Sequence, residues 1–273
     1  MMYKDKLSKL IKESKSNLVI GLDTDYEKIP TVFRSAKNPI LEFNLRIIEA
    51  TSKYCAGYKI NLAFYEASGI KGIEALEETV KTIPQNLIKI CDAKRGDIGN
   101  TAELYARAYL DNLNFDSITV SPYMGHDSVL PFLKRKEKFV YLLVRTSNKG
   151  AEDFQALKSG NKEFFDIVAT KALTWSKNQI GYVIGANHYN EIKRYSSTKE
   201  NIPLLIPGIG AQGNDLETLM MNLCNDLFLI NSSRSIIFAG HSDDSESVYM
   251  HKVSEQANLL NDLINLLRKN RTK

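Results

Sequence analysis

Eight short apolar runs alternate with stretches of helical periodicity along this chain, and this alternation constrains the fold more than any other feature. The runs that we expect to form strands are residues 17–23, 55–61, 87–92, 117–121, 139–145, 181–185, 202–207 and 226–231. Strands that alternate with helices pair in parallel through right-handed crossovers. Eight such units in 273 residues predict one α/β domain over residues 1–273, folded as a (β/α)₈ TIM barrel.

Between the predicted strands, apolar residues recur at a spacing near the 3.6 residues of a helical turn. The positions that define these stripes are Leu41, Leu45 and Ile48; Ile73, Leu76 and Val80; Phe164, Val168, Ala172 and Trp175; Leu216, Leu219, Met220 and Leu223; and Leu260, Leu263, Ile264 and Leu267. We interpret each stripe as a helix face that packs on the core, and not as a cofactor-binding segment.

Composition narrows the class of protein. Hydrophobic residues make up 43% of the chain and charged residues 25%, as is typical of a globular protein. No apolar run is long enough to span a bilayer, and no apolar signal segment follows the first six residues. The three cysteines are an odd number without a CxxC pair, which suits a reducing compartment. We therefore expect a cytoplasmic protein without membrane contact.

The net charge of +4 is mildly basic. Lysine and arginine residues are scattered along the chain and form no stripe, so the sequence gives little support for a nucleic-acid partner. This charge balance is compatible with a small anionic ligand.

Polar residues follow nearly every predicted strand. The residues in question are Asp23; Lys59 and Asn61; Asp92, Lys94 and Asp97; Thr119 and Ser121; Arg145 to Asn148; Pro207 to Gly213; and Asn231 to Arg234. In a TIM barrel the carboxyl ends of the strands carry the active site. Packing does not explain polar groups at so many strand ends, so we expect them to meet at one mouth of the barrel.

The densest charge lies at the ends of the second and third predicted strands. Strand alternation puts Asp92 and Lys94 on one face, and Lys59 and Asp97 are expected beside them. A solvated ion pair would give the same short motif and contribute less than about 1 kcal/mol. Opposite charges about 4 Å apart at the barrel mouth interact by roughly 4 kcal/mol at an effective dielectric near 20, which keeps the groups ionised and fixed.

Gly208, Gly210 and Gly213 form a GxGxxG segment between a predicted strand and a helix. A dinucleotide fingerprint belongs early in a βαβ unit and needs an acidic residue at the end of the next strand. Here the next strand ends in Asn231. The loops after strands 7 and 8 of a barrel often bind phosphate, and Arg234 supplies a bidentate cation, so we interpret the segment as a phosphate loop. A plain tight turn is the other interpretation.

Sequence spacing favours no metal site. The four histidines form no HExxH or similar pattern, and no GxSxG nucleophile motif is present. A Mg²⁺ ion on Asp92 and Asp97 stays open, although the ammonium groups of Lys59 and Lys94 would weaken it.

Five segments carry a family resemblance: Asp92-Ala-Lys-Arg-Gly-Asp-Ile-Gly-Asn-Thr101, Lys59 to Glu66, Ser121 to Gly125, Pro207 to Gly213, and Ser233-Arg234. Together they resemble orotidine 5′-phosphate decarboxylases, specifically the longer subgroup. The resemblance implies a barrel homodimer that converts orotidine monophosphate to uridine monophosphate and CO₂, the last step of UMP synthesis. It also implies that neither a metal nor an organic cofactor takes part.

The same resemblance implies roles for individual residues. Lys94 would protonate C6 of the pyrimidine, with Asp92 and Lys59 beside it. The other implied contacts are Asp23 and Asn61 at the ribose, Ser147 at the base, Pro207 beside the substrate, Gln212 and Arg234 at the phosphate, and Asp97 and Thr101 in the partner subunit's site. Ser233 departs from the pattern, because many relatives have glycine before the phosphate-binding arginine.

Two other functions remain open from the residues alone. One is a magnesium-dependent sugar-phosphate decarboxylase or epimerase on the same barrel, which a chelator would inhibit. The other is a non-catalytic protein that binds a nucleotide or phosphosugar without turnover. Such a protein would have no need for Lys94 between two acids.

Overall fold

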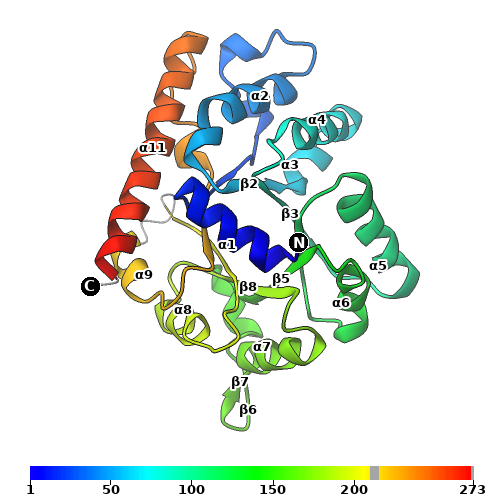
Figure 1. Cartoon of the computed structure of the whole chain (residues 1–273). Coiled ribbons are helices and arrows are strands. Elements are labelled where there is room, and N and C mark those ends of the chain that lie inside the picture. The colour runs from blue at the N-terminus through cyan, green and yellow to red at the C-terminus, as the bar shows by residue number, and fades with distance from the viewer. Residues whose placement is uncertain (210–214, 272–273) are drawn as a thin grey trace.

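The computed structural model describes residues 1–209 and 215–271. Eight parallel strands close into a barrel in the order β1-β10-β9-β8-β5-β4-β3-β2 (Figure 1). Their bounds are β1 Leu18–Gly21, β2 Gly57–Asn61, β3 Ile88–Arg95, β4 Ser117–Val120, β5 Phe139–Arg145, β8 Ile180–Ile184, β9 Leu204–Pro207 and β10 Phe228–Ser232. Two short antiparallel strands, β6 Lys158–Ser159 and β7 Lys162–Glu163, form a hairpin outside the barrel.

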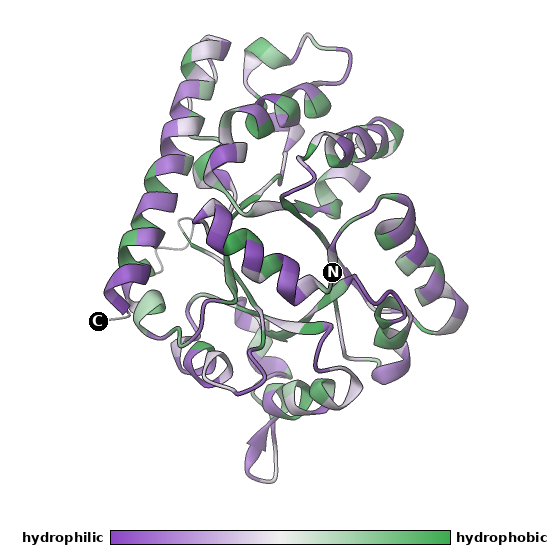
Figure 2. Ribbon diagram, viewed as in Figure 1, coloured by the Kyte–Doolittle hydropathy of each residue, from purple (hydrophilic) through white to green (hydrophobic). Residues whose placement is uncertain are grey.

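Helices surround the barrel and turn their apolar faces toward the strands (Figure 2). Their bounds are α1 Tyr3–Ser14, α2 Pro39–Thr51, α3 Leu62–Glu66, α4 Gly69–Thr82, α5 Gly99–Ala106, α6 His126–Leu133, α7 Phe164–Trp175, α8 Tyr189–Ser196, α9 Leu216–Met221, α10 Arg234–Ile237 and α11 Glu246–Arg271. A π-helical segment, η4 Arg107–Asn112, continues α5. Short 3₁₀ turns occupy Tyr26–Lys28, Thr31–Phe33, Ser52–Tyr54 and Lys149–Asp153.

The structure confirms the predicted barrel and all eight predicted strands. The main difference is at the third strand, which we expected to end at Asp92. It continues to Arg95 and places Lys94 on the strand itself. The pairing of β3 with β4 shifts register between Cys91 and Arg95, so the added residues form an irregular strand end that periodicity alone does not reveal.

Three predicted helix stripes each contain one exposed residue, Ile73 in α4, Phe164 in α7 and Leu263 in α11, whereas Leu76, Val80 and Ile264 are buried as expected. In α4 the side chain of Ile73 is 48% exposed, whereas Gly72, Ala75 and Thr79 are buried. In α11 the side chain of Leu263 is 44% exposed, and Ile264 is buried. Small and polar residues take part of the buried face in α4 and α11, so hydropathy alone misplaces single residues at its edge.

Helix α1 covers the end of the barrel where the strands begin (Figure 1). The buried ring of Tyr3 stacks on Phe139 with centroids 4.4 Å apart. Its hydroxyl donates to Ser117 Oγ at 3.5 Å and lies 3.2 Å from the hydroxyl of Tyr141. These contacts close the amino-terminal end of the barrel, so a ligand has access from the opposite end.

No helix in the described part of the chain combines the length and hydropathy that a membrane span requires.

Gly57 lies at a close approach of β2 to β3. A methyl group at this position would lie 2.1 Å from the carbonyl oxygen of Ile88, which is fixed in the sheet. We expect Gly57→Ala to lower the free energy of unfolding by about 3 kcal/mol, the upper range for overpacking. Gly150→Ala is the control, because its nearest neighbour atom lies at an ordinary 3.5 Å. Urea unfolding of both variants measures the difference, and equal stabilities would contradict the tight β2–β3 contact.

Candidate active site

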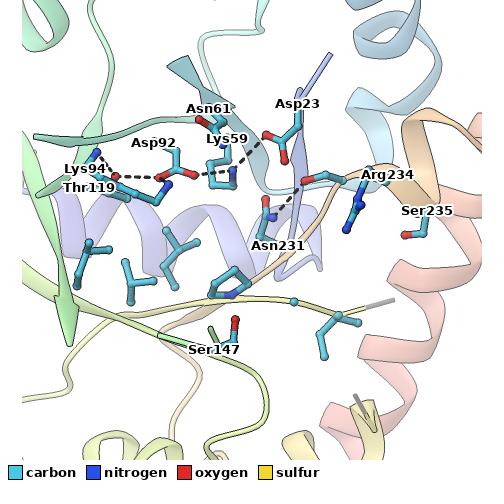
Figure 3. Close-up of a pocket in the computed structure, with 17 residues that line it drawn as sticks. Asp23, Lys59, Asn61, Asp92, Lys94, Thr119, Ser147, Asn231, Arg234 and Ser235 are labelled. Atoms are coloured by element: carbon cyan, nitrogen blue, oxygen red, sulfur yellow. Dashed lines mark hydrogen bonds and ion pairs between the residues drawn. The ribbon is translucent and has the colours of Figure 1, made fainter. Parts of the chain in front are cut away.

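Residues from all eight barrel strands, or from the segments that follow them, line a cavity of about 250 Å³ at the open end. One wall is charged and polar, formed by Asp23, Lys59, Asn61, Asp92, Lys94 and Thr119 from the region of β1 to β4. The strands across the barrel, β5, β8 and β9, contribute the apolar side chains of Leu143, Val183 and Leu205. Ser147 lies opposite the charged residues (Figure 3). The cavity therefore offers an apolar surface to one face of a ligand and charge to its edge.

The polar wall is a row of alternating charges. Lys59 Nζ lies 2.9 Å from Asp92 Oδ2 and 3.4 Å from Asp23 Oδ1. Lys94 Nζ donates to the other oxygen of Asp92, Oδ1, at 2.7 Å. The row thus runs Asp23, Lys59, Asp92, Lys94 (Figure 3). The side chain of Lys59 is only 6% exposed, whereas that of Lys94 is 50% exposed, so Lys94 is the cation of this row that a ligand can reach.

Ion pairing outweighs burial in this row. Burial alone would raise the pKa of Asp92, but the ammonium groups of Lys59 and Lys94 hold the pKa far below its usual value. Burial would likewise lower the pKa of Lys59, but the carboxylates of Asp92 and Asp23 raise it. Asp92 and Lys59 are therefore ionised across the physiological range, and Asp92 bears a permanent negative charge beside Lys94.

Thr119 fixes both Asp92 and the backbone of Lys94. Its hydroxyl donates to Asp92 Oδ1 at 2.9 Å and accepts from the Lys94 amide nitrogen at 3.0 Å. The sequence pattern placed Thr119 at a strand end but gave it no role. The signal that could have found it is a hydroxyl at the end of β4, the strand adjacent to Asp92.

Lys94 has an unusual backbone. Its φ angle is +48°, in the left-handed region, where residues other than glycine and asparagine are rare. The residue lies within the register shift between β3 and β4. Strained backbones of this kind cluster at functional sites.

The other end of the cavity has the features expected of an anion site. Gly208, whose φ of +103° favours glycine, lines the cavity together with Pro207 and Ile209. Arg234 lies at the end of the cavity away from Lys94 (Figure 3). The Arg234 side chain is exposed at the start of α10. Of the predicted phosphate loop, Gly210, Gln212 and Gly213 lie outside the described residues.

Ser233, which departs from the family pattern, occupies a close contact between β1 and the end of β10. A Cβ atom on Gly21 would lie 1.8 Å from Ser233 Oγ. The hydroxyl also accepts from Asn231 Nδ2 at 3.3 Å. Glycine at position 21 therefore leaves the space that this serine fills.

Asp97 and Thr101 do not join the charge row within one chain. The carboxylate of Asp97 accepts from the Ile98 amide at 2.8 Å, and the Thr101 side chain is exposed in the first turn of α5. Neither residue lines the cavity. Of the other predicted site residues that the structure describes, Asp23, Lys59, Asn61, Asp92, Lys94, Ser147, Pro207, Gly208 and Arg234 do.

The donor set is poorly suited to a cation. Within residues 1–209 and 215–271, no group of three or more His, Cys, Asp or Glu side chains is arranged to hold a metal ion. The two carboxylates of the cavity are each adjacent to an ammonium group, which would oppose a divalent ion.

Comparisons with known proteins identify the family of the chain. Residues 16–247 match the orotidine 5′-phosphate decarboxylase / HUMPS family. The chain belongs to this family. It is 46% identical to the orotidine 5′-phosphate decarboxylase of Dehalococcoides mccartyi strain CBDB1, over 98% of this chain and 99% of the relative. Its identity to the same enzyme of Christiangramia forsetii is 44%, over 94% and 97% of the two chains.

Solved structures of the family have the same fold. The OMP decarboxylase of Leishmania donovani is 33% identical and superposes with a TM-score of 0.84, covering 98% of this chain and 99% of that one. A putative orotidine-monophosphate decarboxylase of Toxoplasma gondii is 29% identical, with a TM-score of 0.86 and coverage of 99% and 97%.

Asp92 provides a direct test of the ion-pair row. We expect Asp92→Asn to lower the free energy of unfolding by about 3–5 kcal/mol, because Lys59 then stays buried with only Asp23 beside it. Glu77→Gln, which weakens an exposed pair with Lys81, should cost about 1 kcal/mol or less. Urea unfolding gives both values.

The lowered pKa of Asp92 also predicts how the stability difference between the wild type and Asp92→Asn depends on pH. Because the pKa of Asp92 is lowered in the folded chain, its contribution is complete above the unfolded value of about 3.9 and is lost as the pH falls through the folded pKa. The stability difference between wild type and Asp92→Asn should therefore stay constant from about pH 7 to about pH 5. A difference that shrinks across this range would contradict the ionised row.

Proposed function

We propose that this protein converts orotidine 5′-monophosphate to uridine 5′-monophosphate and CO₂, with Lys94 as the group that stabilises and protonates the reacting carbon. Membership of the decarboxylase family supports the reaction. The observation that carries the residue assignment is the row of alternating charges, which presents one accessible ammonium, held by a permanently ionised carboxylate, to the cavity.

The proposed chemistry needs no electron sink. The bond between C6 and the carboxylate carbon breaks, CO₂ leaves, and the electron pair stays on C6 in the plane of the ring. The ammonium of Lys94 stabilises this charge and then transfers a proton to C6, which gives the C–H bond of the product. The neutral amine regains a proton from solvent. Charges that are fixed before the reaction stabilise such a transition state without reorganisation.

The neighbours of Lys94 have supporting roles in this proposal. Asp92 holds the ammonium in place through a 2.7 Å hydrogen bond, and Lys59 keeps Asp92 ionised from the other side. Asp23 and Asn61 line the same wall, and we assign them to the ribose. Repulsion between Asp92 and the substrate carboxylate is a further effect, on which the mechanism does not depend.

The rest of the substrate is assigned by position. The apolar wall with Ser147 suits the flat pyrimidine, and Pro207 and Arg234 mark the phosphate end. Gln212 is assigned to the phosphate by family resemblance alone. Binding energy at the phosphate, far from C6, can organise the cavity around the base.

A homodimer with shared sites is part of the proposal. Asp97 and Thr101 carry polar groups that no cavity in their own chain uses. In the loops after β3, β4 and β5, the apolar side chains of Ile98, Tyr123 and Phe154 are 49%, 73% and 60% exposed, and the ring centroids of Tyr123 and Phe154 lie 6.4 Å apart. Exposed apolar groups of this kind mark interaction surfaces. A second copy on this surface would bring Asp97 and Thr101 to the partner subunit's cavity. We further propose that the dimer acts in the cytoplasm.

The alternatives have less support. The relatives at 44–46% identity bear the name orotidine 5′-phosphate decarboxylase, and none of these comparisons favours a magnesium-dependent sugar-phosphate enzyme. A protein that binds a nucleotide without turnover would not need the Lys94 ammonium held beside the buried acid Asp92.

The reaction and the role of Lys94 are tested together. The loss of orotidine monophosphate, monitored by ultraviolet absorbance, should have the same rate with and without EDTA. Lys94→Ala should lower kcat by at least about a thousandfold, the upper range for loss of one preorganised electrostatic group, while UMP still binds. Lys81→Ala, an exposed lysine of α4, is the control and should keep wild-type turnover. Inhibition by EDTA would favour the magnesium enzyme, and wild-type kcat in Lys94→Ala would refute the assignment.

Shared sites predict complementation between two inactive variants. Lys94→Ala and Asp97→Ala each damage both sites of a homodimer, but a mixed dimer has one undamaged site. An equal mixture of exchanged subunits should recover about a quarter of wild-type activity, because half of the dimers are mixed and each has one working site. No recovery in dimers verified to be mixed would show that the sites are not shared.

A further inference from the structure

The left-handed backbone of Lys94 needs an explanation in the surrounding structure. A residue with a side chain holds such a φ angle only where its neighbours impose it, at a cost of about 1–3 kcal/mol. The hydrogen bond from the Lys94 amide to Thr119 secures one side. The residue on the other side, Arg95, has contacts that the ion-pair row does not involve.

The Arg95 guanidinium closes a loop around Lys94. Its Nη1 donates to the carbonyl oxygen of Ala93 at 3.2 Å, so one side chain joins the residues before and after Lys94. The Arg95 carbonyl accepts from the Ser121 amide at 2.8 Å, where the pairing of β3 with β4 resumes. Lys94 therefore lies between two fixed points: the hydrogen bond from Arg95 to Ala93 spans it, and β4 holds the residue that follows it.

The same guanidinium is anchored on two other elements. Its Nη2 donates to the hydroxyl of Tyr109 at 2.7 Å and to Glu66 Oε1 at the end of α3. Its carbon lies 4.9 Å from the ring centroid of Tyr105 and 5.3 Å from that of Tyr109. These two rings are stacked nearly parallel, with an interplanar angle of 6°. Tyr105 belongs to α5 and Tyr109 to the π-helical η4.

We propose that Arg95 is a positioning residue for the decarboxylation: it holds the left-handed backbone that aims the Lys94 ammonium into the cavity. This inference rests on the proposed role of Lys94. Arg95 does not line the cavity and has no contact with substrate in the proposal. It acts through the Ala93 carbonyl on one side of Lys94 and through the tyrosine pair of α5 and η4 on the other.

The chemistry of arginine fits this role better than that of lysine. The guanidinium donates to three acceptors while its carbon stays within cation–π distance of two aromatic rings. An ammonium could pair with Glu66 but could not keep all these contacts. We therefore expect Arg95→Lys to behave like the loss of the side chain and not like the wild type.

A merely structural role for Arg95 is the competing explanation, and Arg135 is the matched control. Arg135 is similarly covered, with a side chain 14% exposed against 21% for Arg95. It also joins the α5–η4 segment, by donating to Glu103 and Asp111. It makes no bond to residues 93–95. Arg135→Met thus removes a comparable network and leaves Lys94 untouched.

The experiment compares kcat and KM for orotidine monophosphate in Arg95→Met, Arg95→Lys and Arg135→Met, with stability measured for each. Displacement of a reacting group by about 1 Å can cost a hundredfold in rate. We expect kcat to fall at least about tenfold in both Arg95 variants with KM within about twofold, and kcat to stay at the wild-type value in Arg135→Met. Loss of stability with unchanged kcat in Arg95→Met would overturn the proposal.

Tyr109→Phe keeps the ring and removes only the hydrogen bond to Arg95, so it serves if Arg95→Met does not fold. Its kcat should lie between those of the wild type and Arg95→Lys, and wild-type kcat in this variant would also overturn the proposal.

A crystal structure separates failure of this inference from failure of the proposed function. If the wild type does not decarboxylate orotidine monophosphate, the proposed function fails, whatever Arg95 does. The positioning role is then read from the Lys94 φ angle in crystals of the wild type and of Arg95→Lys. A φ that changes sign in the variant supports it, and a φ that stays near +48° refutes it.

Discussion

The buried carboxylate of Asp92 is the interaction on which the site depends. One of its oxygens meets the ammonium of Lys59 and the other meets Lys94 and the hydroxyl of Thr119. Removing two charges from water costs several kcal/mol each, and only close contacts of both signs offset this cost. The row is stable because each acid has a base beside it. Its last member is half-exposed and can act on a ligand.

The barrel makes this arrangement possible by having two different ends. Aromatic packing of α1 closes one end, where no ligand chemistry is expected. The polar residues at the other end come from strands that are distant in sequence and adjacent in the sheet. The charged wall comes from the region of β1 to β4 and the apolar wall from β5, β8 and β9. A flat anion with one reactive edge suits this division.

Much of this could be predicted from the sequence, because strand periodicity and strand order are local signals. Lys59 and Asp92 follow directly from alternation at two strand ends, and both line the cavity. The left-handed φ of Lys94 could not be predicted, because contacts with β4 and with Arg95 impose it and Lys itself disfavours it. The position of Ile73 was misjudged because close helix packing selected small residues for the buried face. Gly210, Gln212 and Gly213 stay predictions.

The closure at Tyr3 has a consequence for the order of folding. Its hydroxyl meets Ser117 and Tyr141, which are 114 and 138 residues further along the chain. Contacts between such distant residues form slowly, because closing the long loop costs conformational entropy before the contacts can offset that cost. Helix α1 can therefore dock only after the middle strands have assembled. Until then the apolar face of α1 and the amino-terminal ends of the strands are both uncovered. At this stage the nascent protein is most exposed to aggregation.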